Sequence, residues 1–378
     1  MFHVKHVASG DCRRGKIQIS RDVKALGMGL LSLAFLLALT ACSGIASPRG
    51  WASPQFADNM LLAPLNHDAL IAVDLEAGAK DWEFPPPKSD VSLQALYATP
   101  AVSQGIVFVG GYNGTLYALD MADGSEKWSQ ATGGHIIGGP VTGEGTVYVG
   151  SADSCLYAFA VDSGNQRFDR ICTGAKIWST PVVSSGVVYF GSMDKKVYAI
   201  DAVSGESHWP QPFKADGAIA STLVVDGGTV YVGGLDNYMY ALDASNGEMR
   251  WRFKADDWIW DRALVSGGTV YFGTLGGKVY ALDASNGQLR WEKPFQGDGV
   301  VRGGPAMVGS TLVVATDKGN VYGLNASGGS QVWLQQAGSG VLSDLVVDGE
   351  MVYYSTKSGD VEKVDAADGT ITSVQVPE

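Results

Sequence analysis

Cysteine and histidine are the side chains of this chain that could bind a transition metal or act as nucleophiles. The four cysteines, Cys12, Cys42, Cys155 and Cys172, form no CxxC pair. His67, His135 and His208 follow Cys42 at wide intervals, each apart from the cysteines. Metal sites in proteins need such ligands at short, characteristic spacings. The sequence therefore predicts no metal site.

Aspartate is the next side chain that could do acid–base chemistry, and it recurs at a fixed place. Each copy follows a short apolar run and precedes a turn glycine, as in Ala-Leu-Asp-Ala-Ser-Asn-Gly. The recurring aspartates are Asp74, Asp120, Asp201, Asp243, Asp283 and Asp365. Aspartate commonly accepts hydrogen bonds from turn amides. An active site has to break the symmetry of a repeat, so we predict a structural role for these residues and no catalytic residue.

The N-terminal part has the features of an export signal. Arg21 and Lys24 precede an apolar run that ends at Ala41, and small residues follow, which is the order of a signal peptide. Leu39-Thr40-Ala41-Cys42 resembles the bacterial lipobox, in which the cysteine carries the lipid. We expect residues 1–22 to be an untranslated leader, 23–41 a lipoprotein signal, Cys42 the lipidated residue and 42–51 a linker. An uncleaved anchor helix is the alternative.

The remainder, residues 52–378, repeats one unit. Its register is marked by turn glycines about 40 residues apart: Gly78, Gly124, Gly164, Gly205, Gly247, Gly287, Gly329 and Gly369. In the fourth unit we predict strands over Thr180–Val183, Val187–Ser192, Lys196–Ala202 and Glu206–Phe213. Such a spacing suits one four-stranded blade. We predict an all-β, eight-bladed β-propeller of antiparallel blades, eight being preferred over seven.

Seven of the eight units end in a large aromatic residue, in the pattern A-(L/I)-D-A-x-x-G-x-x-x-W. This pattern resembles the tryptophan-docking motif of the quinoprotein (PQQ)-like propeller family, over residues 52–378. A large ring fills the gap between neighbouring blades. The predicted blade-docking residues are Trp82, Trp128, Phe168, Trp209, Trp251, Trp291 and Trp333.

Two cysteines flank the third-to-fourth strand hairpin of the third unit. Counting outward from its turn places Cys155 nearly opposite Cys172. A disulfide could form there in an oxidising compartment, and two separate buried thiols are the alternative.

The units differ most where each enters its innermost strand. The equivalent positions are Trp51, Tyr97, Ile137, Trp178, Ile219, Trp260, Arg302 and Val341. In a propeller these positions line one mouth of the central channel, and Asp257, Trp258, Asp261 and Arg262 lie close to Trp260 in sequence. We predict a binding rim of Trp51, Tyr97, Trp178, Asp257, Trp258, Trp260, Arg262 and Arg302. Rings that simply plug the channel are the alternative.

The net charge of −12 excludes a nucleic-acid partner, because phosphate binding needs a basic face.

The lipobox, the eight units and the acidic balance resemble the propeller lipoprotein family of the outer-membrane β-barrel assembly machinery. This implies a binding scaffold for envelope proteins, attached to a membrane by its lipid and needing no cofactor. A dehydrogenase using pyrroloquinoline quinone and calcium is one alternative, although the adjacent cysteine pair and long insertions of many such enzymes are missing. An extracytoplasmic ligand or glycan sensor is the other.

Overall fold

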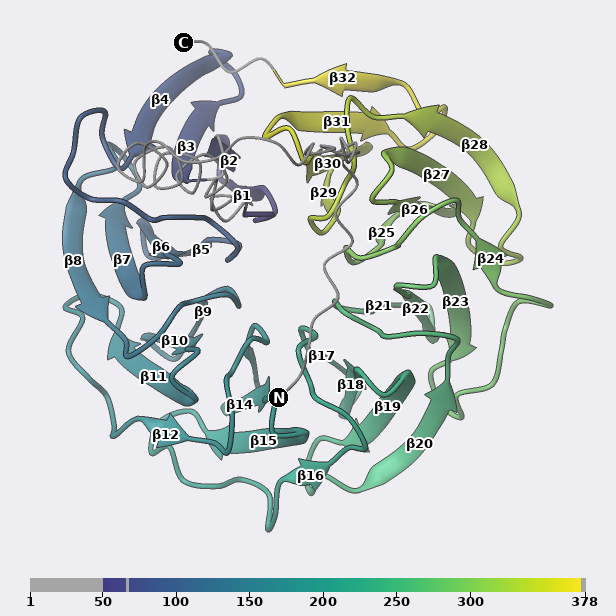
Figure 1. Ribbon diagram of the computed structural model, residues 1–378, viewed down its shortest axis with the longest axis horizontal. Helices are drawn as coiled ribbons and strands as arrows, with labels where there is room; N and C mark the ends of the chain where they lie inside the picture. The colour runs from purple at the N-terminus through teal and green to yellow at the C-terminus, as the bar shows by residue number, and fades with distance from the viewer. Residues whose placement is uncertain (1–49, 66–67, 375–378) are drawn as a thin grey trace, which may run out of the picture. The chain divides into compact units, whose positions relative to one another are not determined.

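The computed structural model describes residues 50–65 and 68–374 as eight antiparallel sheets of four strands each. The sheets surround a central axis, and the first strand of each lies innermost (Figure 1). We number them as blades 1 to 8 in chain order. The predicted all-β, eight-bladed propeller is confirmed.

Each blade is one contiguous stretch of chain. Blades 1 to 4 consist of β1 (Gln55–Ala57), β2 (Met60–Leu65), β3 (Ala69–Asp74), β4 (Ala79–Phe84); β5 (Ala101–Ser103), β6 (Ile106–Gly110), β7 (Thr115–Asp120), β8 (Glu126–Ala131); β9 (Val141–Gly143), β10 (Thr146–Gly150), β11 (Cys155–Ala160), β12 (Ile171–Cys172); and β13 (Val182–Ser184), β14 (Val187–Gly191), β15 (Lys196–Asp201), β16 (Phe213–Lys214). Blades 5 to 8 consist of β17 (Val224–Asp226), β18 (Thr229–Gly233), β19 (Tyr238–Asp243), β20 (Met249–Lys254); β21 (Leu264–Ser266), β22 (Thr269–Gly273), β23 (Lys278–Asp283), β24 (Phe295–Gln296); β25 (Ala306–Val308), β26 (Thr311–Ala315), β27 (Asn320–Asn325), β28 (Gln331–Gln336); and β29 (Val346–Asp348), β30 (Met351–Ser355), β31 (Val361–Asp365), β32 (Ile371–Ser373).

The outermost strand of blade 4 is much shorter than predicted. We expected a strand over Glu206–Phe213, but β16 contains only Phe213 and Lys214. Pro210 and Pro212 interrupt this segment, and proline cannot donate a hydrogen bond to a sheet. A single isolated bridge, between Ile200 and Ser207, remains of the predicted pairing.

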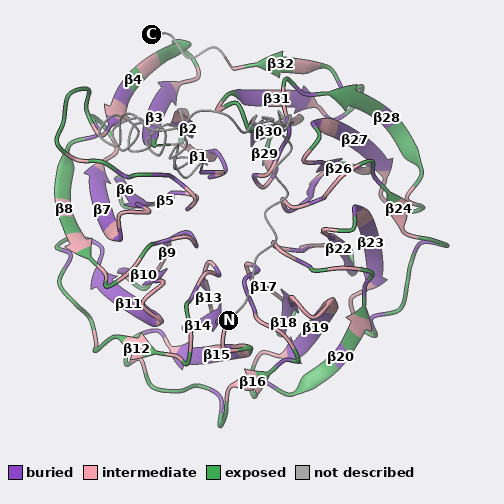
Figure 2. Ribbon diagram, viewed as in Figure 1, coloured by how far each residue is buried: buried purple, intermediate pink, exposed green. Residues whose placement is uncertain are grey.

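The middle strands are buried, and the outermost strands are largely exposed (Figure 2). The second strand of blade 5, which spans Thr229–Gly233, is buried throughout. Both faces of a blade pack on neighbouring blades. The middle strands are therefore continuous apolar runs and do not alternate between apolar and polar residues. The core is therefore a series of apolar layers, one between each pair of adjacent blades.

The recurring tryptophans close the seam between their own blade and the following one. The Trp251 indole Nε1 donates to the Ala284 carbonyl at 2.9 Å. A Cβ added to Gly287, which has a φ of +72°, would come within 2.7 Å of the Trp251 ring. Glycine therefore serves two needs there, the left-handed backbone and the close approach of the ring. The same donation joins Trp82 to Met121, Trp128 to Val161, Trp209 to Ala244, Trp291 to Ala326 and Trp333 to Ala366.

The repeated aspartates hold the turns between third and fourth strands. Asp201 Oδ1 accepts hydrogen bonds from the amides of Val203 and Ser204. Asp283 Oδ1 accepts from Ser285, and these hydrogen bonds, together with one from Arg290, lower the pKa of the Asp283 carboxyl to about 2. The repeated aspartate carboxylates therefore stabilise the turns that contain them.

The ring closes between blade 8 and blade 1 without exchanging a strand. Phe56 packs edge-on against Tyr353, with ring centroids 4.7 Å apart. Leu61 and Ile71 of blade 1 share an apolar cluster with Val361 of blade 8. Side-chain packing therefore closes the ring in place of a shared sheet.

Candidate functional site

The segments that enter the innermost strands meet at the axis of the ring and enclose a cavity of about 60 Å³. Each segment leaves the outer edge of one blade and runs inward to begin the next (Figure 1). The residues around this axial cavity come from seven blades. They are Trp51, Ser53, Tyr97, Thr99, Ile137, Gly138, Trp178, Thr180, Ala220, Thr222, Trp260, Asp261 and Asp344.

Arg302 lies between two indole rings beside this axial cavity. Its guanidinium carbon is 3.6 Å from the centroid of the Trp51 ring and 4.6 Å from that of Trp260. Indole faces attract a cation, and they do so more strongly when water is excluded. No carboxylate of the described residues lies within ion-pair distance of Arg302, and burial lowers the pKa of its guanidinium to about 10. The cation is therefore held by aromatic rings.

A row of rings continues from Trp51 around the mouth. Trp51 meets Tyr97 edge-on at 4.2 Å between centroids, and Tyr97 meets Tyr112 at 5.2 Å. Tyr112 stacks flat on His135 at 3.9 Å, and the His135 Nδ1 contacts the Tyr112 carbonyl. These last two residues do not belong to the predicted rim, because Tyr112 follows β6 and His135 precedes the aligned position Ile137. Neighbouring blades thus present one aromatic surface.

The axial region holds polar groups that lack partners. Trp178 Nε1 and Arg302 Nε are buried, and neither has a hydrogen-bond partner among the described residues. An unsatisfied buried donor costs about 1 to 3 kcal/mol. Both donors are therefore buried without a hydrogen bond from the described residues.

Asp261 adds a carboxyl group to the wall of the axial cavity. Burial, followed by the nearby Asp344 carboxylate, raises the pKa of Asp261 well above its ordinary value. The site therefore combines one aromatic-held cation with a carboxyl that is easily protonated.

A second, more open hollow of about 250 Å³ lies beside Trp260. It is lined by Trp260, Leu275, Val300, Arg302, Asp317 and Leu342. We call it the outer hollow. Arg302 and Trp260 form part of its wall, so the aromatic-held cation can be approached through it.

Arg262, a residue of the predicted rim, pairs with an aspartate of another blade. Its Nε donates to Asp344 Oδ2 at 3.0 Å, and its Nη2 donates to the Leu345 carbonyl at 3.0 Å. The Asp344 carboxylate also accepts from the Gly304 amide, and the Asp344 amide donates to the Ser53 hydroxyl at 2.8 Å. Four blades are joined through this one aspartate.

The predicted rim is thus brought together in part. Trp51, Tyr97, Trp178, Trp260 and Arg302 meet at the axis. Asp257 and Trp258 line neither hollow: the Asp257 carboxylate accepts from the Trp258 amide at 2.8 Å, and Trp258 is 44% exposed. Asp344 was not among the predicted residues. Five units have a proline just before the innermost strand, at Pro54, Pro100, Pro140, Pro181 and Pro305. The residue before that position is small in most units and charged at Arg262 and Asp344.

Two channel positions differ from the prediction by one residue. Ile219 and Val341 are buried in the apolar layers between blades, at 0% and 2% exposure. Ala220 lines the axial cavity and Leu342 the outer hollow in their place. Leu223 and Leu345 stand where five other units have a proline, and the prediction aligned these two units one residue out of register.

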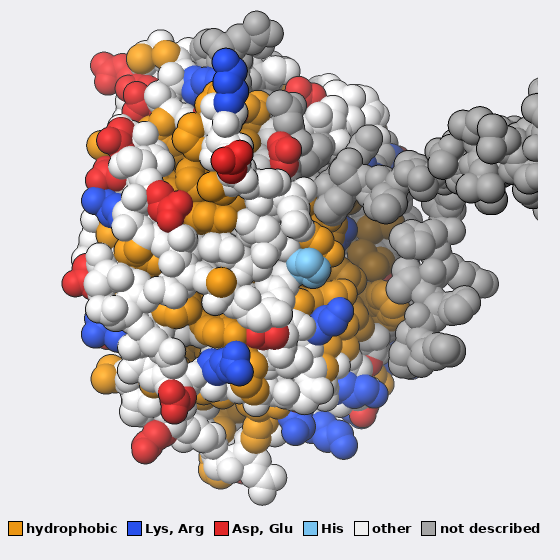
Figure 3. Space-filling model, turned by 60° about the vertical axis from the view of Figure 1, so that its left-hand side comes forward, with side chains coloured by type: hydrophobic (Ala, Val, Ile, Leu, Met, Phe, Trp, Pro, Cys, Tyr) orange, Lys and Arg blue, Asp and Glu red, His pale blue; other side chains and the backbone are white. Residues whose placement is uncertain are grey.

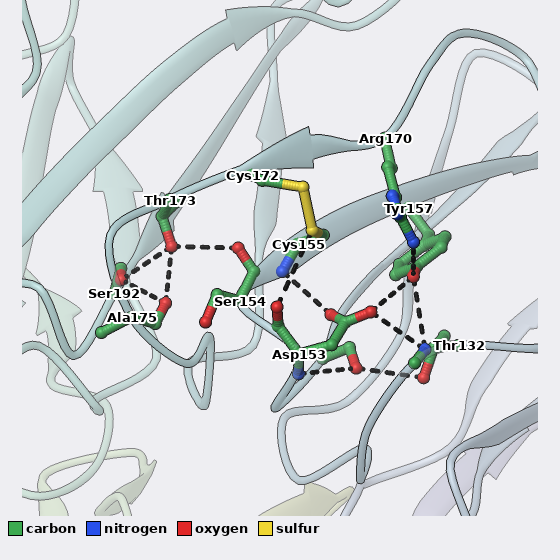
Figure 4. The surroundings of a disulfide bond; sticks show 12 residues. Thr132, Asp153, Ser154, Cys155, Tyr157, Arg170, Cys172, Thr173, Ala175 and Ser192 are labelled. Carbon is green, nitrogen blue, oxygen red and sulfur yellow. Dashed lines mark hydrogen bonds between the residues drawn. A yellow bond between two sulfur atoms is a disulfide. The ribbon is translucent and has the colours of Figure 1, made fainter.

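The structure links Cys155 and Cys172 by a disulfide bond (Figure 4). These residues stand opposite each other where β11 pairs with the two-residue β12. Beside the bridge, Tyr157 donates to Asp153 Oδ2 at 2.5 Å, and Arg170 donates to the Tyr157 hydroxyl at 3.1 Å. The bridge and this polar cluster hold a short edge strand that few backbone hydrogen bonds secure.

The charged side chains are mixed in sign on the flank that Figure 3 shows, with no single block of either charge. Within the described residues, no group of three or more His, Cys, Asp or Glu side chains could hold a metal ion. No helix of residues 50–65 or 68–374 is long and apolar enough to cross a membrane. Cys42 and the segments 1–22 and 23–41 lie outside the described residues.

Comparison with protein families gives one match that spans most of the chain. The family model described as "Outer membrane protein assembly factor BamB" matches residues 66–170, 167–301 and 296–372. The outer membrane protein assembly factor BamB of Xanthomonas campestris pv. campestris is 33% identical over 91 residues, which are 23% of this chain and 22% of that protein.

Enzymes share parts of this likeness. The quinohemoprotein alcohol dehydrogenase ADH IIB of Pseudomonas putida is 29% identical over 118 residues, 30% of this chain and 16% of that enzyme. The chain thus aligns with less than a quarter of either relative.

The crystal structure of BamB from Moraxella catarrhalis superposes with a TM-score of 0.71 at 17% identity, covering 82% of this chain and 93% of that one. At this identity the superposition concerns the fold alone.

Proposed function

The chain belongs to the family whose model is described as "Outer membrane protein assembly factor BamB", and we propose that it is a non-enzymatic scaffold that binds proteins of the cell envelope. The named role of that family is the assembly of outer-membrane proteins. By extension, the partner of this chain is a component of the outer-membrane barrel assembly machinery. We further propose that Cys42 carries a lipid that attaches the propeller to a membrane outside the cytoplasm.

The observation that carries this proposal is the Arg302 guanidinium held between Trp51 and Trp260 at an open hollow. Aromatic residues and arginine are the side chains that dominate the binding energy of protein interfaces. Arg302 and Trp260 both line the outer hollow, which brings the cation and an aromatic ring within reach of a partner. A partner segment seated in the outer hollow would cover both side chains.

The dehydrogenase alternative fits this axis poorly. A cavity of about 60 Å³ has room for only a few water molecules, since each needs about 10–15 Å³ of such space. A three-ring quinone needs far more. A bound calcium ion takes about six to eight oxygen ligands, and the described residues place no cluster of acidic side chains that could supply them. The chain therefore does not fit pyrroloquinoline quinone and calcium at the axis.

Site-directed photo-crosslinking in the native envelope tests the proposal. We would place a benzophenone amino acid at Leu342, which lines the outer hollow, and a second at Val203, which is 73% exposed on an outer turn. The Leu342 probe is expected to crosslink to a barrel-assembly component, and the Val203 probe is not.

Matched charge variants complete this test. Arg302→Ala should remove the crosslink, whereas Arg252→Ala removes an arginine paired with the exposed Asp216 and should leave it intact. Equal crosslinking from both probe positions would contradict the proposed interface. Recovery of a glycan or a small molecule in place of a protein would instead favour the ligand-sensor alternative.

A further inference from the structure

Among the described residues, one of the eight seams between blades has no aromatic ring on its turn glycine. At the six tryptophan seams, an indole lies on the turn glycine of the following blade and donates to a carbonyl of the same turn, as Trp251 does with Gly287 and Ala284. Phe168 occupies the same place over Gly205 at a seventh seam. The eighth seam, from blade 8 to blade 1, closes the ring.

The place of the docking ring is open at this closing seam. Among the described residues, a Cβ added to Gly78 of blade 1 would meet no atom within 4 Å, whereas at the seven other seams it would meet an aromatic ring at less than 3 Å. A hollow of about 200 Å³ lies here, bordered by Leu75, Gly78, Tyr353, Lys363, Ser373 and Val374. We call it the closing-seam hollow.

Blade 8 has no aromatic residue after Gly369, and the register of its outermost strand also differs from that of blade 5. In blade 5 a β-bulge places Trp251 opposite Ala241, so the indole lies over a small residue. Blade 8 has no bulge in this pairing, and Thr372 stands opposite Lys363 instead. The Lys363 ammonium lies 5.7 Å from the centroid of the Tyr353 ring, at the edge of the hollow.

The backbone acceptor of the other seams is also present. Leu75 follows Asp74 as Ala284 follows Asp283, so its carbonyl corresponds to the one that accepts the Trp251 indole. No hydrogen bond to the Leu75 carbonyl oxygen is found among the described residues. The glycine floor, the acceptor and an adjacent cation are therefore all in place.

We propose that the closing-seam hollow binds the indole side chain of a tryptophan presented by a partner protein. The indole lies on Gly78, donates its N–H to the Leu75 carbonyl and meets the Lys363 ammonium at its ring face. A cation at an indole face is a favourable, directional contact. A buried indole covers roughly 150–250 Å² and is a frequent anchor at interfaces.

The described residues supply no such occupant. All ten tryptophans of the printed sequence are among them, and none of these lies on Gly78. Trp258 is 44% exposed, but its use by a second copy would join unlike surfaces and produce an open chain of subunits. A separate protein is therefore the source. This inference is independent of the axial site.

The test uses N-acetyl-5-fluorotryptophanamide as the probe and the full chain as the receptor. The fluorine signal of the probe should broaden saturably on addition of the protein. N-acetyl-leucinamide should not displace the probe, whereas unlabelled N-acetyltryptophanamide should. Absence of broadening, or broadening that does not saturate, would overturn the proposal.

A variant that fills the hollow from within locates the binding. Thr372→Trp combined with Lys363→Ala places an indole opposite an alanine, as in blade 5. The filled variant should lose the broadening and should unfold at a higher temperature than the parent. If this variant does not fold, Lys363→Ala alone should weaken the broadening, while Lys195→Ala, on another blade, should not. Broadening that persists in the folded filled variant would show that the probe binds elsewhere.

Discussion

Arg262 Nε lies 3.0 Å from Asp344 Oδ2, so an ion pair joins blade 6 to blade 8 at the axis of the ring. The two side chains are 29% and 17% exposed. The Asp344 carboxylate, more than any other group, raises the pKa of the Arg262 guanidinium. Because Asp344 also contacts Gly304 and Ser53, the pair couples the closing seam to the blades that precede it.

Replacing Asp344 by alanine should destabilise the propeller markedly. The change leaves the Arg262 cation without its carboxylate in a part-buried place, a loss that typically costs about 3 kcal/mol. Urea unfolding followed by circular dichroism measures it. Asp216→Ala breaks the exposed Arg252 pair and should change little. Equal effects of both substitutions would argue against a special role for the axial pair.

Replacing Trp251 by phenylalanine isolates the hydrogen bond of one seam. The ring remains, but the donation to the Ala284 carbonyl is lost, at about 1 kcal/mol. Trp251→Ala also removes the packing and should cost about 3 to 5 kcal/mol. Trp258→Phe, on an exposed indole, serves as the control in the same unfolding experiment. A Trp251→Ala protein as stable as this control would contradict seam packing.

Removing the disulfide should lower the stability of blade 3 and of the whole ring. Cys155 and Cys172 are 17 residues apart, and closing a loop of this size stabilises by about 3 kcal/mol in the chain-entropy view. The Cys155→Ser, Cys172→Ser double variant should melt earlier in calorimetry. The reduced parent should match it, and two reactive thiols in the unfolded, unreduced parent would exclude the bridge.

Stability should depend on pH through Asp261. Its pKa is raised in the folded protein, so the folded state binds the proton more tightly than the unfolded state does. The stabilisation that Asp261 contributes is fully present below the ordinary pKa of aspartate. It is lost as the pH rises through the raised pKa of the folded state. Asp261→Asn keeps the oxygen that accepts from the Arg262 amide and should abolish this loss. Parallel pH–stability curves for parent and variant would show that Asp261 does not titrate in this way.

The repeated features of the fold could be predicted from the sequence because they are local. A turn glycine, an aspartate and, in seven of the eight units, an aromatic residue recur in one short segment. The aspartate holds the turn of its own blade, and the aromatic ring packs on the turn glycine of the next blade. Eight such segments therefore indicate eight blades and their docking rings. The short β16 was not foreseen, because the prolines that interrupt it fall outside the recurring segment.

The candidate sites depend on contacts between units that are distant in sequence, and only the closed ring brings these together. Trp51 and Trp260 hold Arg302 because the first and sixth blades both border the axis. Arg262 and Asp344 look like two isolated charges in the sequence, yet closure makes them one ion pair. The sequence shows that blade 8 has no aromatic residue at the docking position. Whether the seam is then filled or hollow depends on strand register and packing. Local repetition specifies the blades, and three-dimensional closure decides what their differences form.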